Sequence, residues 1–294
     1  MNTSPDLVLR PAVPEDTPAV MELTSTIWEG HDYVPHVWHE WLADVHGLIA
    51  VAELDGRLVG FTRLAKLTAT EWWLQGLRVH PEYEGLRIAS RLHDFIVAYW
   101  AEHHGGTVRF TTWRPQVIHL AERTGFKSLQ EFSLFTTLAL AEPVSSFTPL
   151  PPAHAPQALS YLQGSPAISL TAGLMTLGWE WIRPTLENLT SLANDGLVWR
   201  WQGERGLLSA YKDTEEIEEG IEVQHLFIRL LACQLDHILP CLLDFRCLAA
   251  QMGYSRAGWV APLVEPVFSA LQAADFTRAW DGYVNLFELT RPLK

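Results

Sequence analysis

The feature that most constrains the fold of this chain is an internal repeat, because two halves that share landmarks are expected to share a fold. Three landmarks of the first half return in the second half at an offset of 149 or 150 residues. The matched segments are residues 48–61 with 197–210, residues 75–79 with 224–228, and residues 123–126 with 273–276. The sequence therefore predicts a duplicated domain, and two unrelated α/β domains are the alternative.

The first repeat has the pattern of a mixed α/β domain. Two apolar runs flank Asp55-Gly56, a dipeptide typical of tight β-hairpins. A strand is predicted over residues 72–79, and a helix is predicted from Ser90 until glycines near residue 105 stop it.

Prolines gather between residues 143 and 156, and a proline-rich stretch is typical of a stiff, extended linker. We therefore expect one domain over residues 1–143, a linker over residues 144–156, and a second domain over residues 157–294.

Net charge and the cysteine positions exclude several kinds of partner and site. The formal net charge is −13, and a negative field repels phosphate backbones, so no nucleic-acid partner is expected. Cys233, Cys241 and Cys247 lack the spacing of a disulfide framework or a metal site. We expect them to be reduced and buried in a cytoplasmic protein, with no metal bound and no membrane association.

The segment with the clearest chemistry runs from Val79 to Leu92. It leaves a strand, turns at Gly85, passes through the small residues Ala89 and Ser90, and enters a helix. Backbone N–H groups at such a helix start have no intrahelical acceptor, so they are suited to cradle a diphosphate. An ordinary strand-to-helix turn with solvated arginines is the alternative.

This segment resembles the diphosphate loop of the GCN5-related N-acetyltransferase (GNAT) family, which appears here as residues 84–89. Other family landmarks occur in the same order across residues 7–138, including Asp55-Gly56 and Gly125-Phe126. The resemblance implies an α/β (α+β) fold class. It comprises two tandem GNAT-like domains, each a mixed, mostly antiparallel sheet flanked by helices, with the second domain degenerate.

The resemblance also implies acetyl-CoA as co-substrate. The residues expected to bind it are Leu77, Arg78, Val79, Glu84, Gly85, Leu86, Arg87, Ile88, Ala89 and Ser90. Three positions depart from the family pattern: Glu84 stands where Gln or Arg is usual, Arg87 replaces a Gly, and Ala121 replaces a Tyr that many members use as general acid. The second repeat has no glycine at the corresponding place, so we expect no cofactor there.

Residues 27–35 and 75–81 further resemble the histidine N-alpha-acetyltransferase group, in which a Glu stands where this chain has Gln75. That likeness implies an acceptor site near the loop that carries Asp32. We assign Asp32 and Gln75 as candidate catalytic residues, with Gln75 expected on the same strand face as Leu77 and Val79. An N-cap or turn role is the alternative for Asp32. The candidate substrate-binding residues are His31, Tyr33, Trp113 and Arg114.

These features together predict an acetyl-CoA-dependent N-acetyltransferase that acts by direct transfer on the amine of a small molecule or amino acid. The protein is expected to be a monomer or homodimer. The alternative is a non-catalytic acyl-CoA-binding sensor with the same fold.

Overall fold

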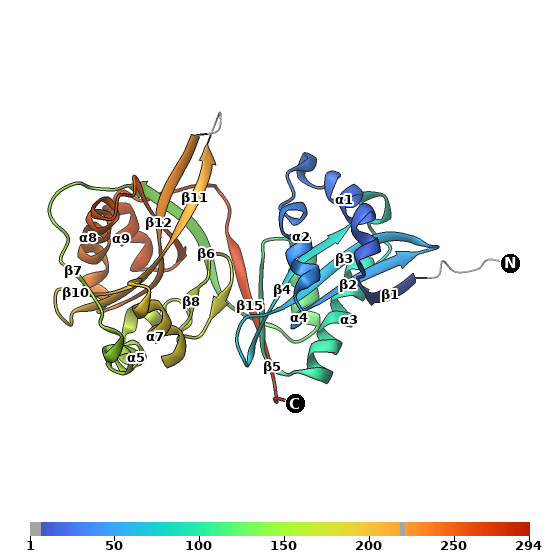
Figure 1. Ribbon diagram of the computed structural model, residues 1–294, viewed down its shortest axis with the longest axis horizontal. Helices are drawn as coiled ribbons and strands as arrows, with labels where there is room; N and C mark the ends of the chain where they lie inside the picture. Colours follow the sequence, from blue (N-terminus) through green and yellow to red (C-terminus); the bar gives the residue numbers. More distant parts are fainter. Residues whose placement is uncertain (1–6, 218–220) are drawn as a thin grey trace. The chain divides into compact units, whose positions relative to one another are not determined.

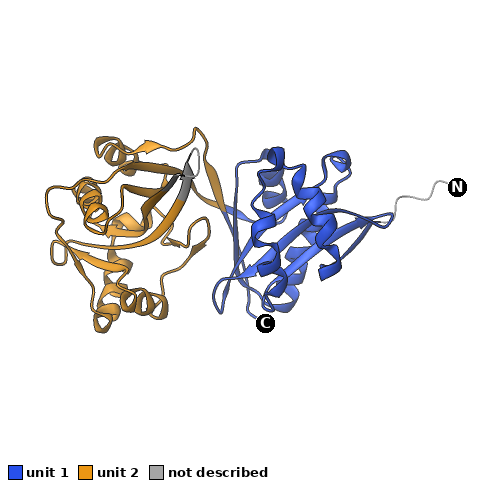
Figure 2. Cartoon of the chain, turned by 45° about the horizontal axis from the view of Figure 1, so that its top comes forward, with its two compact units in different colours: residues 1–127, 287–294 blue, residues 128–286 orange. Residues whose placement is uncertain are grey.

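The computed structural model (Figure 1) describes residues 7–217 and 221–294. The chain forms two compact units (Figure 2). Unit 1 comprises Met1–Lys127 together with Phe287–Lys294, and unit 2 comprises Ser128–Leu286. The units therefore do not follow the order of the sequence, because the end of the chain belongs with its beginning.

Unit 1 contains a sheet in which neighbouring strands from β1 (Leu7–Pro11) to β4 (Glu71–Val79) are antiparallel, and β4 pairs with β5 (Gly106–Thr112) in parallel. Residues 287–291 of the last strand lie beside β5 in this unit. In spatial order the strands are β1 (Leu7–Pro11), β2 (Leu48–Leu54), β3 (Arg57–Lys66), β4 (Glu71–Val79), β5 (Gly106–Thr112) and β15 (Val284–Arg291).

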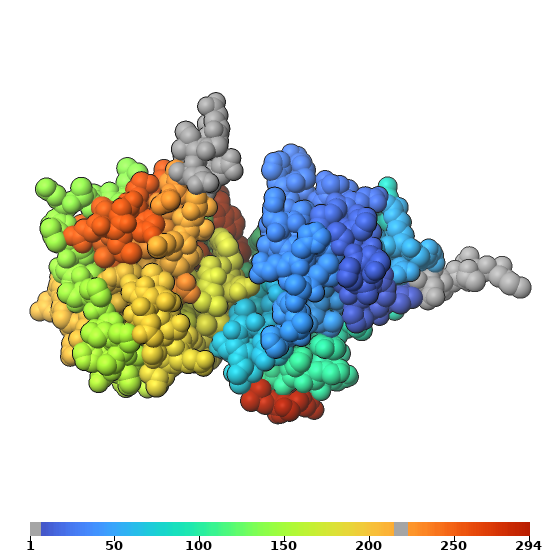
Figure 3. All heavy atoms as spheres, viewed as in Figure 1, coloured from blue at the N-terminus to red at the C-terminus, as the bar shows by residue number. Residues whose placement is uncertain are grey.

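Helices cover both faces of the unit 1 sheet. Apolar residues of α1 and α2 form one core with β2 and β3, and these helices lie on the face turned to the viewer in Figure 3. Helix α3 buries Ile88, Leu92, Ile96 and Trp100, spaced four residues apart, against the other face. The helices are η1 (Pro14–Asp16), α1 (Thr17–Ser25), η2 (Trp28–Gly30), α2 (Val34–Ala43), η3 (Pro81–Tyr83), α3 (Ile88–His103) and α4 (Pro115–Arg123).

Unit 2 repeats this arrangement, with β12 (Ile221–Cys233) and β13 (Arg256–Pro262) as a parallel pair. In spatial order its strands are β6 (Lys127–Leu138), β13 (Arg256–Pro262), β12 (Ile221–Cys233), β11 (Gly206–Ile217), β10 (Val198–Trp201) and β7 (Phe147–Pro149), with β14 (Thr277–Arg278) paired to β6. A separate hairpin joins β8 (Met175–Thr176) and β9 (Trp181–Ile182). The helices are η4 (Pro152–His154), α5 (Ala155–Gly164), α6 (Pro166–Ser169), α7 (Leu186–Asn194), η6 (Leu235–His237), α8 (Ile238–Gln251) and α9 (Val267–Ala273).

The internal repeat is visible as a repeated order of elements, so the predicted fold class is confirmed. In each unit a hairpin leads into a strand, a long helix and a strand parallel to the first one, as in β4–α3–β5 and β12–α8–β13. The landmark pair of residues 75–79 and 224–228 differs between the units in its strand pairing. Residues 225–228 pair with β13, whereas residues 75–79 lie beyond the last pair that β4 forms with β5.

The last strand of each repeat lies in the other unit. Strand β6, which ends the first repeat, pairs with β13 of unit 2, and residues 287–294, which end the second repeat, complete unit 1. The unit boundary after Lys127 therefore precedes the residue 143 boundary expected from the sequence. The proline-rich segment expected as a linker contains β7, paired along one side with β10, which is the edge position where prolines are tolerated.

The C-terminal segment is fixed in unit 1 by a buried ion-pair network. The Arg109 guanidinium, which is fully buried, donates from Nη1 to Glu71 Oε1 at 2.6 Å and from Nε to Glu288 Oε2 at 2.8 Å. The ring of Phe287 stacks on Phe110 with centroids 5.4 Å apart. Strand β15 is thus held to β5 by both charge pairing and apolar contact.

Candidate active site

Strand β4 carries an irregularity at the point where the predicted site begins. Phe61 is paired with Arg78 and Arg63 with Gln75, so Gly76 and Leu77 together lie opposite Thr62 alone. Gly76 has a φ of +67°, and a Cβ placed on it would meet the Trp41 ring at 2.9 Å. Both the backbone conformation and the close ring contact require glycine here.

This bulge changes the face on which Gln75 lies, which corrects the expectation that it shares a face with Leu77 and Val79. Leu77 and Val79 pack with α3. Gln75 is the direct cross-strand partner of Arg63, whose guanidinium lies 4.9 Å from the Trp41 ring of α2. Directly paired residues in a sheet lie on the same face, so Gln75 lies on the α2 face, as does Arg78 opposite Phe61.

The end of β4 separates from β5. The parallel ladder between them runs from Glu71 with Thr107 to Trp73 with Arg109, and from there to Val79 strand β4 is paired with β3 but not with β5. Leu77, Arg78 and Val79 are each partly exposed. The β4–β5 ladder does not reach these three residues, although the Leu77 carbonyl accepts a hydrogen bond from Arg78 Nη1 at 3.2 Å. This stretch of backbone can therefore receive a ligand that lies between the two strands.

The connection from β4 to α3 leads directly from this opening. Glu84, Gly85, Leu86 and Arg87 are all exposed, and a Cβ placed on Gly85 would meet no atom within 4 Å. Arg87 occupies the N-cap position of the 16-residue helix α3 with a left-handed φ of +59° and no side-chain capping bond. Its backbone thus takes the conformation that the usual family Gly adopts at low cost.

Asp32 and Arg78 form a two-bonded ion pair on the α2 face of β4. Arg78 donates from Nε to Asp32 Oδ2 at 2.8 Å and from Nη2 to Oδ1 at 3.0 Å. Asp32 is 2% exposed, and its Oδ1 also accepts from the Val34 backbone N–H at the start of α2. The turn role weighed for Asp32 is therefore present together with a long-range charge pairing.

Aromatic rings surround the Arg78 guanidinium. Its central carbon lies 4.5 Å from the Trp28 ring centroid and 5.6 Å from that of Tyr33. Tyr33 in turn contacts Trp41 edge to face at 6.0 Å. We call Trp28, Asp32, Tyr33, Gln75 and Arg78 the acceptor-face cluster, because charged and aromatic groups of these types can hold a polar small molecule.

The loop that supplies Trp28 is conformationally unusual. Trp28, Glu29 and Gly30 have φ values of 47°, 58° and 88°, all in the left-handed region. Two consecutive non-glycine residues in this region carry backbone strain, and such strain gathers at binding sites where the surroundings maintain it. Trp28 as a whole is 42% exposed, although its ring contacts the Arg78 guanidinium.

The other predicted site residues lie apart from this pairing. His31 is exposed, and its Nδ1 is 3.1 Å from the Trp28 carbonyl. Trp113 and Arg114 are exposed at the end of β5, where the Arg114 backbone caps α4. Ala121, at the place of the family's usual Tyr, is fully buried. Sequence reasoning did not select Trp28, Trp41 or Arg63, although a glycine inside strand β4 is a signal of a bulge and close packing.

Charge pairing continues beside the acceptor-face cluster. Arg63 donates to Asp44 Oδ2 at 2.8 Å. Burial by itself raises the pKa of Asp44, but hydrogen bonds from the His46 backbone N–H and from Arg63 outweigh it and hold that pKa below its usual value.

A group of three or more His, Cys, Asp or Glu side chains that could hold a metal ion is not found among residues 7–217 and 221–294.

The second unit has a different connection at the equivalent place. Between β12 and α8 lie Gln234, Leu235, Asp236 and His237, without glycine, whereas residues 80–87 separate β4 from α3.

The three cysteines of this unit are free thiols and buried. In the part of the chain that the structure describes, a helix long and apolar enough to cross a membrane is not found.

Comparison with protein families matches residues 17–126 to the Acetyltransferase (GNAT) family. The chain is 26% identical over 208 residues to human "Probable N-acetyltransferase 16", an alignment that covers 62% of this chain and 55% of that protein. It is 25% identical over 139 residues to "Histidine N-acetyltransferase" of Xenopus tropicalis, covering 46% of this chain and 43% of that protein. The chain thus spans about half the length of the curated relatives that it matches.

The fold of the whole chain also resembles that of a solved structure. A GCN5-related N-acetyltransferase from Sphaerobacter thermophilus matches 99% of this chain and 98% of its own length, with a TM-score of 0.62 and 14% identity. At this identity the likeness shows the fold alone, and it covers both units.

Proposed function

We propose that this chain, which contains a GNAT acetyltransferase domain over residues 17–126, transfers an acetyl group from acetyl-CoA directly to the amine of a small molecule or amino acid. The observation that carries the proposal is the opening between β4 and β5, which leads to the exposed turn of residues 84–87 and has the acceptor-face cluster on the α2 side of the same strand.

On the cofactor side, the first N–H groups of α3 and the turn at Gly85 would hold the diphosphate of acetyl-CoA. The backbone of β4 at Leu77, Arg78 and Val79 would bind the pantetheine arm and place the thioester carbonyl near the bulge. A backbone N–H there can stabilise the oxyanion that forms when the amine attacks. No side-chain nucleophile is needed, because the reaction requires mainly that the amine and the thioester be held together.

On the acceptor side, Gln75 and Arg78 lie on one face and can donate hydrogen bonds to the substrate. Asp32 is committed to Arg78, so we assign it to positioning that guanidinium and not to accepting a proton. Gln75 does not ionise, and the amine proton therefore passes to water or to a group of the acceptor itself. The C–S bond of the thioester would then break, and the CoA thiolate would take a proton from water, because Ala121 stands where the resembled family often has a Tyr as general acid.

The test is thiol release from acetyl-CoA across a panel of amines and amino acids, with acetyl-CoA affinity measured by calorimetry. Gly85→Trp should abolish acetyl-CoA binding by filling the turn. Gly203→Trp is the matched control, because Gly203 also has a positive φ and open space, but lies in the β10–β11 turn of unit 2. Acetyl-CoA binding that survives Gly85→Trp would overturn the assignment of the turn.

A non-catalytic acyl-CoA sensor remains the second candidate, and the observations that favour it are Glu84 in the exposed turn and Ala121 in place of the usual Tyr. Saturable acetyl-CoA binding without thiol release for every amine tested would favour the sensor. A cytoplasmic location suits either function, because it supplies acetyl-CoA and keeps the three free thiols reduced.

A further inference from the structure

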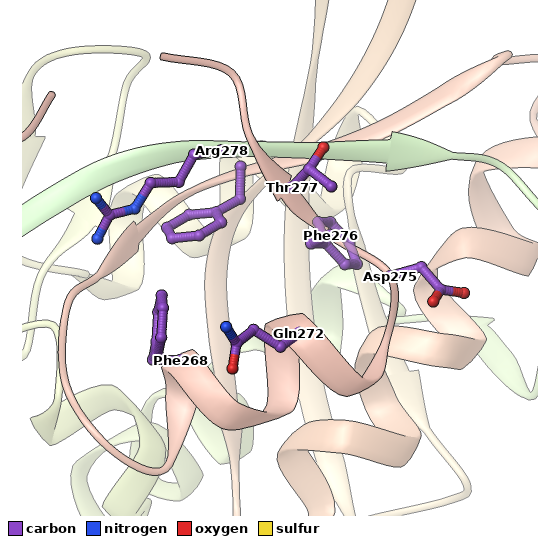
Figure 4. A pocket seen from close by; sticks show the side chains of 7 residues that line it. Phe268, Gln272, Asp275, Phe276, Thr277 and Arg278 are labelled. Atoms are coloured by element: carbon purple, nitrogen blue, oxygen red, sulfur yellow. The ribbon is translucent and has the colours of Figure 1, made fainter. Parts of the chain in front are cut away.

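Unit 2 has a surface pocket of its own, which is lined by none of the residues assigned above. It has a volume of about 500 Å³, within the range of small-molecule sites. Helix α9, strand β14 and strand β6 form it, and its lining residues are Phe135, Phe268, Gln272, Asp275, Phe276, Thr277 and Arg278. Figure 4 shows Arg278, Phe268 and Gln272 around one opening, with Asp275 at the opposite end.

A cation lies over the aromatic wall of this pocket. Arg278 is directly paired with Phe135 across β14 and β6, and its guanidinium carbon is 5.8 Å from the Phe135 ring centroid and 5.7 Å from that of Phe268. The two rings meet edge to face at 6.2 Å. Contacts with ring faces hold the guanidinium while they leave its N–H edges available.

The charge of Arg278 is not neutralised within the pocket. Arg278 forms no ion pair with any residue of the described ranges. The one carboxylate in the lining, Asp275, points away from the opening and binds Arg246 Nη1 at 3.0 Å. The pocket therefore attracts anions in a protein whose net charge is −13.

The first repeat has different side chains at the positions that correspond to Phe268, Gln272 and Arg278. At an offset of 150 residues, the first repeat has Ile118 in place of Phe268, Glu122 in place of Gln272, and Ser128 in place of Arg278. Phe268, Gln272 and Arg278 are thus particular to the second repeat, although helix and strand occur in both.

We propose that this pocket of unit 2 binds an aromatic carboxylate. The N–H edge of Arg278 binds the carboxylate in a two-bonded manner, the Gln272 amide adds a polar contact, and the partly exposed Phe268 ring contacts the aromatic group. The proposal is independent of acetyl transfer, because it uses no residue of the acceptor-face cluster or of the turn over residues 84–87.

The test is calorimetric titration of the full chain with 2-naphthoate and with its neutral analogue 2-naphthamide. We expect 2-naphthoate to bind at least about tenfold more tightly, because a charge-assisted hydrogen bond is lost in the amide. Arg278→Gln should remove this preference, and Phe268→Ala should weaken both compounds. Arg205→Gln, at an exposed arginine of the β10–β11 turn, should change neither.

Equal affinity for 2-naphthoate and 2-naphthamide would overturn the proposal, and so would a preference that persists in Arg278→Gln. Arg278 is exposed, so its replacement is not expected to unfold unit 2. Circular dichroism of each variant checks this point.

Discussion

Asp32 and Arg78, 46 residues apart, join the loop before α2 to the end of strand β4 through two hydrogen bonds of 2.8 and 3.0 Å. Because Asp32 is buried and the Arg78 side chain is 12% exposed, neither charge is well solvated without the other. The pair therefore determines where the Arg78 guanidinium lies between Trp28 and Tyr33, and with it the shape of the acceptor face.

Replacement of Asp32 by Asn should damage turnover more than cofactor binding. Loss of a buried charge-assisted hydrogen bond is worth roughly 1.5–3 kcal/mol, so kcat/KM should fall about 10- to 150-fold while acetyl-CoA affinity stays nearly unchanged. Alkaline pH should not restore the variant, because Asp32 positions Arg78 and does not take a proton.

Asp94→Asn is the matched control for that variant. Asp94 pairs with Arg123 at 2.6 Å, but its side chain is 45% exposed, so its loss should leave kinetics unchanged. Rescue of Asp32→Asn at alkaline pH would assign proton transfer to Asp32, and wild-type kinetics would reduce it to a turn residue.

The bulge at Gly76 should be more sensitive to substitution than the turn at Gly85, although both residues have positive φ. Gly76→Ala places a methyl group 2.9 Å from Trp41, whereas Gly85→Ala meets no atom within 4 Å. We expect Gly85→Ala to cost about 1 kcal/mol of unfolding free energy and Gly76→Ala at least about 2 kcal/mol more, from the added overlap. Urea denaturation measures both, and equal costs would contradict the proposed role of the Trp41 contact.

Arg87→Gly should stabilise the protein, which is unusual for a change to glycine. Arg87 has a φ of +59°, a region that costs most residues roughly 1–2 kcal/mol, so relief of this strain should outweigh the flexibility of glycine by about 0.5–1 kcal/mol. Arg91→Gly, inside α3, should instead cost about 1 kcal/mol. Acetyl-CoA affinity should change less than about fivefold in Arg87→Gly, because an exposed charge contributes little beside backbone N–H groups.

Within the ion-pair network at the C-terminal strand, replacing the shared arginine should lower the free energy of unfolding more than replacing one of its glutamates. Arg109→Met leaves the carboxylates of Glu71 and Glu288 without their shared cation and should cost about 3–5 kcal/mol. Glu288→Gln keeps an acceptor for Arg109 and should cost less. Urea denaturation of each variant, with loss of acetyl-CoA binding as the readout, tests whether unit 1 depends on residues 287–294. Equal losses of unfolding free energy in the two variants would contradict this network as described.

Local signals predicted much of this fold, and contacts distant in sequence account for what was missed. The Asp55-Gly56 hairpin forms with positive φ at both residues, and the repeat offset predicted the paired order of elements. The exchange of β6 and residues 287–294 between units could not be read from local patterns, because it depends on which strands meet in space.

In the candidate site, too, the local motif was predicted from the sequence and the contacts between distant residues were not. The turn over residues 84–87 is a local motif, so its place between β4 and α3 was predicted from the sequence. The period-two pattern put Gln75 on the wrong face, since Gly76 interrupts the strand. The Asp32–Arg78 pair requires α2 to pack on β4, and the sequence around Asp32 alone carries no sign of its partner.

Stability should fall in mild acid because of a buried histidine in unit 1. His93 is 4% exposed, its Nε2 lies 2.9 Å from Thr124 Oγ1, and its ring packs against Phe110 and Phe126. Burial lowers the pKa of His93 from 6.5 to about 4. In the window between these values the unfolded chain binds a proton that the folded chain does not, so the free energy of unfolding falls as pH falls from 6.5 toward 4.

The size of this effect can be isolated with His93→Gln, which keeps a hydrogen-bonding group but does not titrate. Between about pH 7 and pH 5, the wild-type protein should lose about 2 kcal/mol more unfolding free energy than the variant. Urea denaturation at both pH values measures the difference. An equal loss in the two proteins would place the acid sensitivity on other groups, and would mean that the folded state admits a charged His93 at little cost.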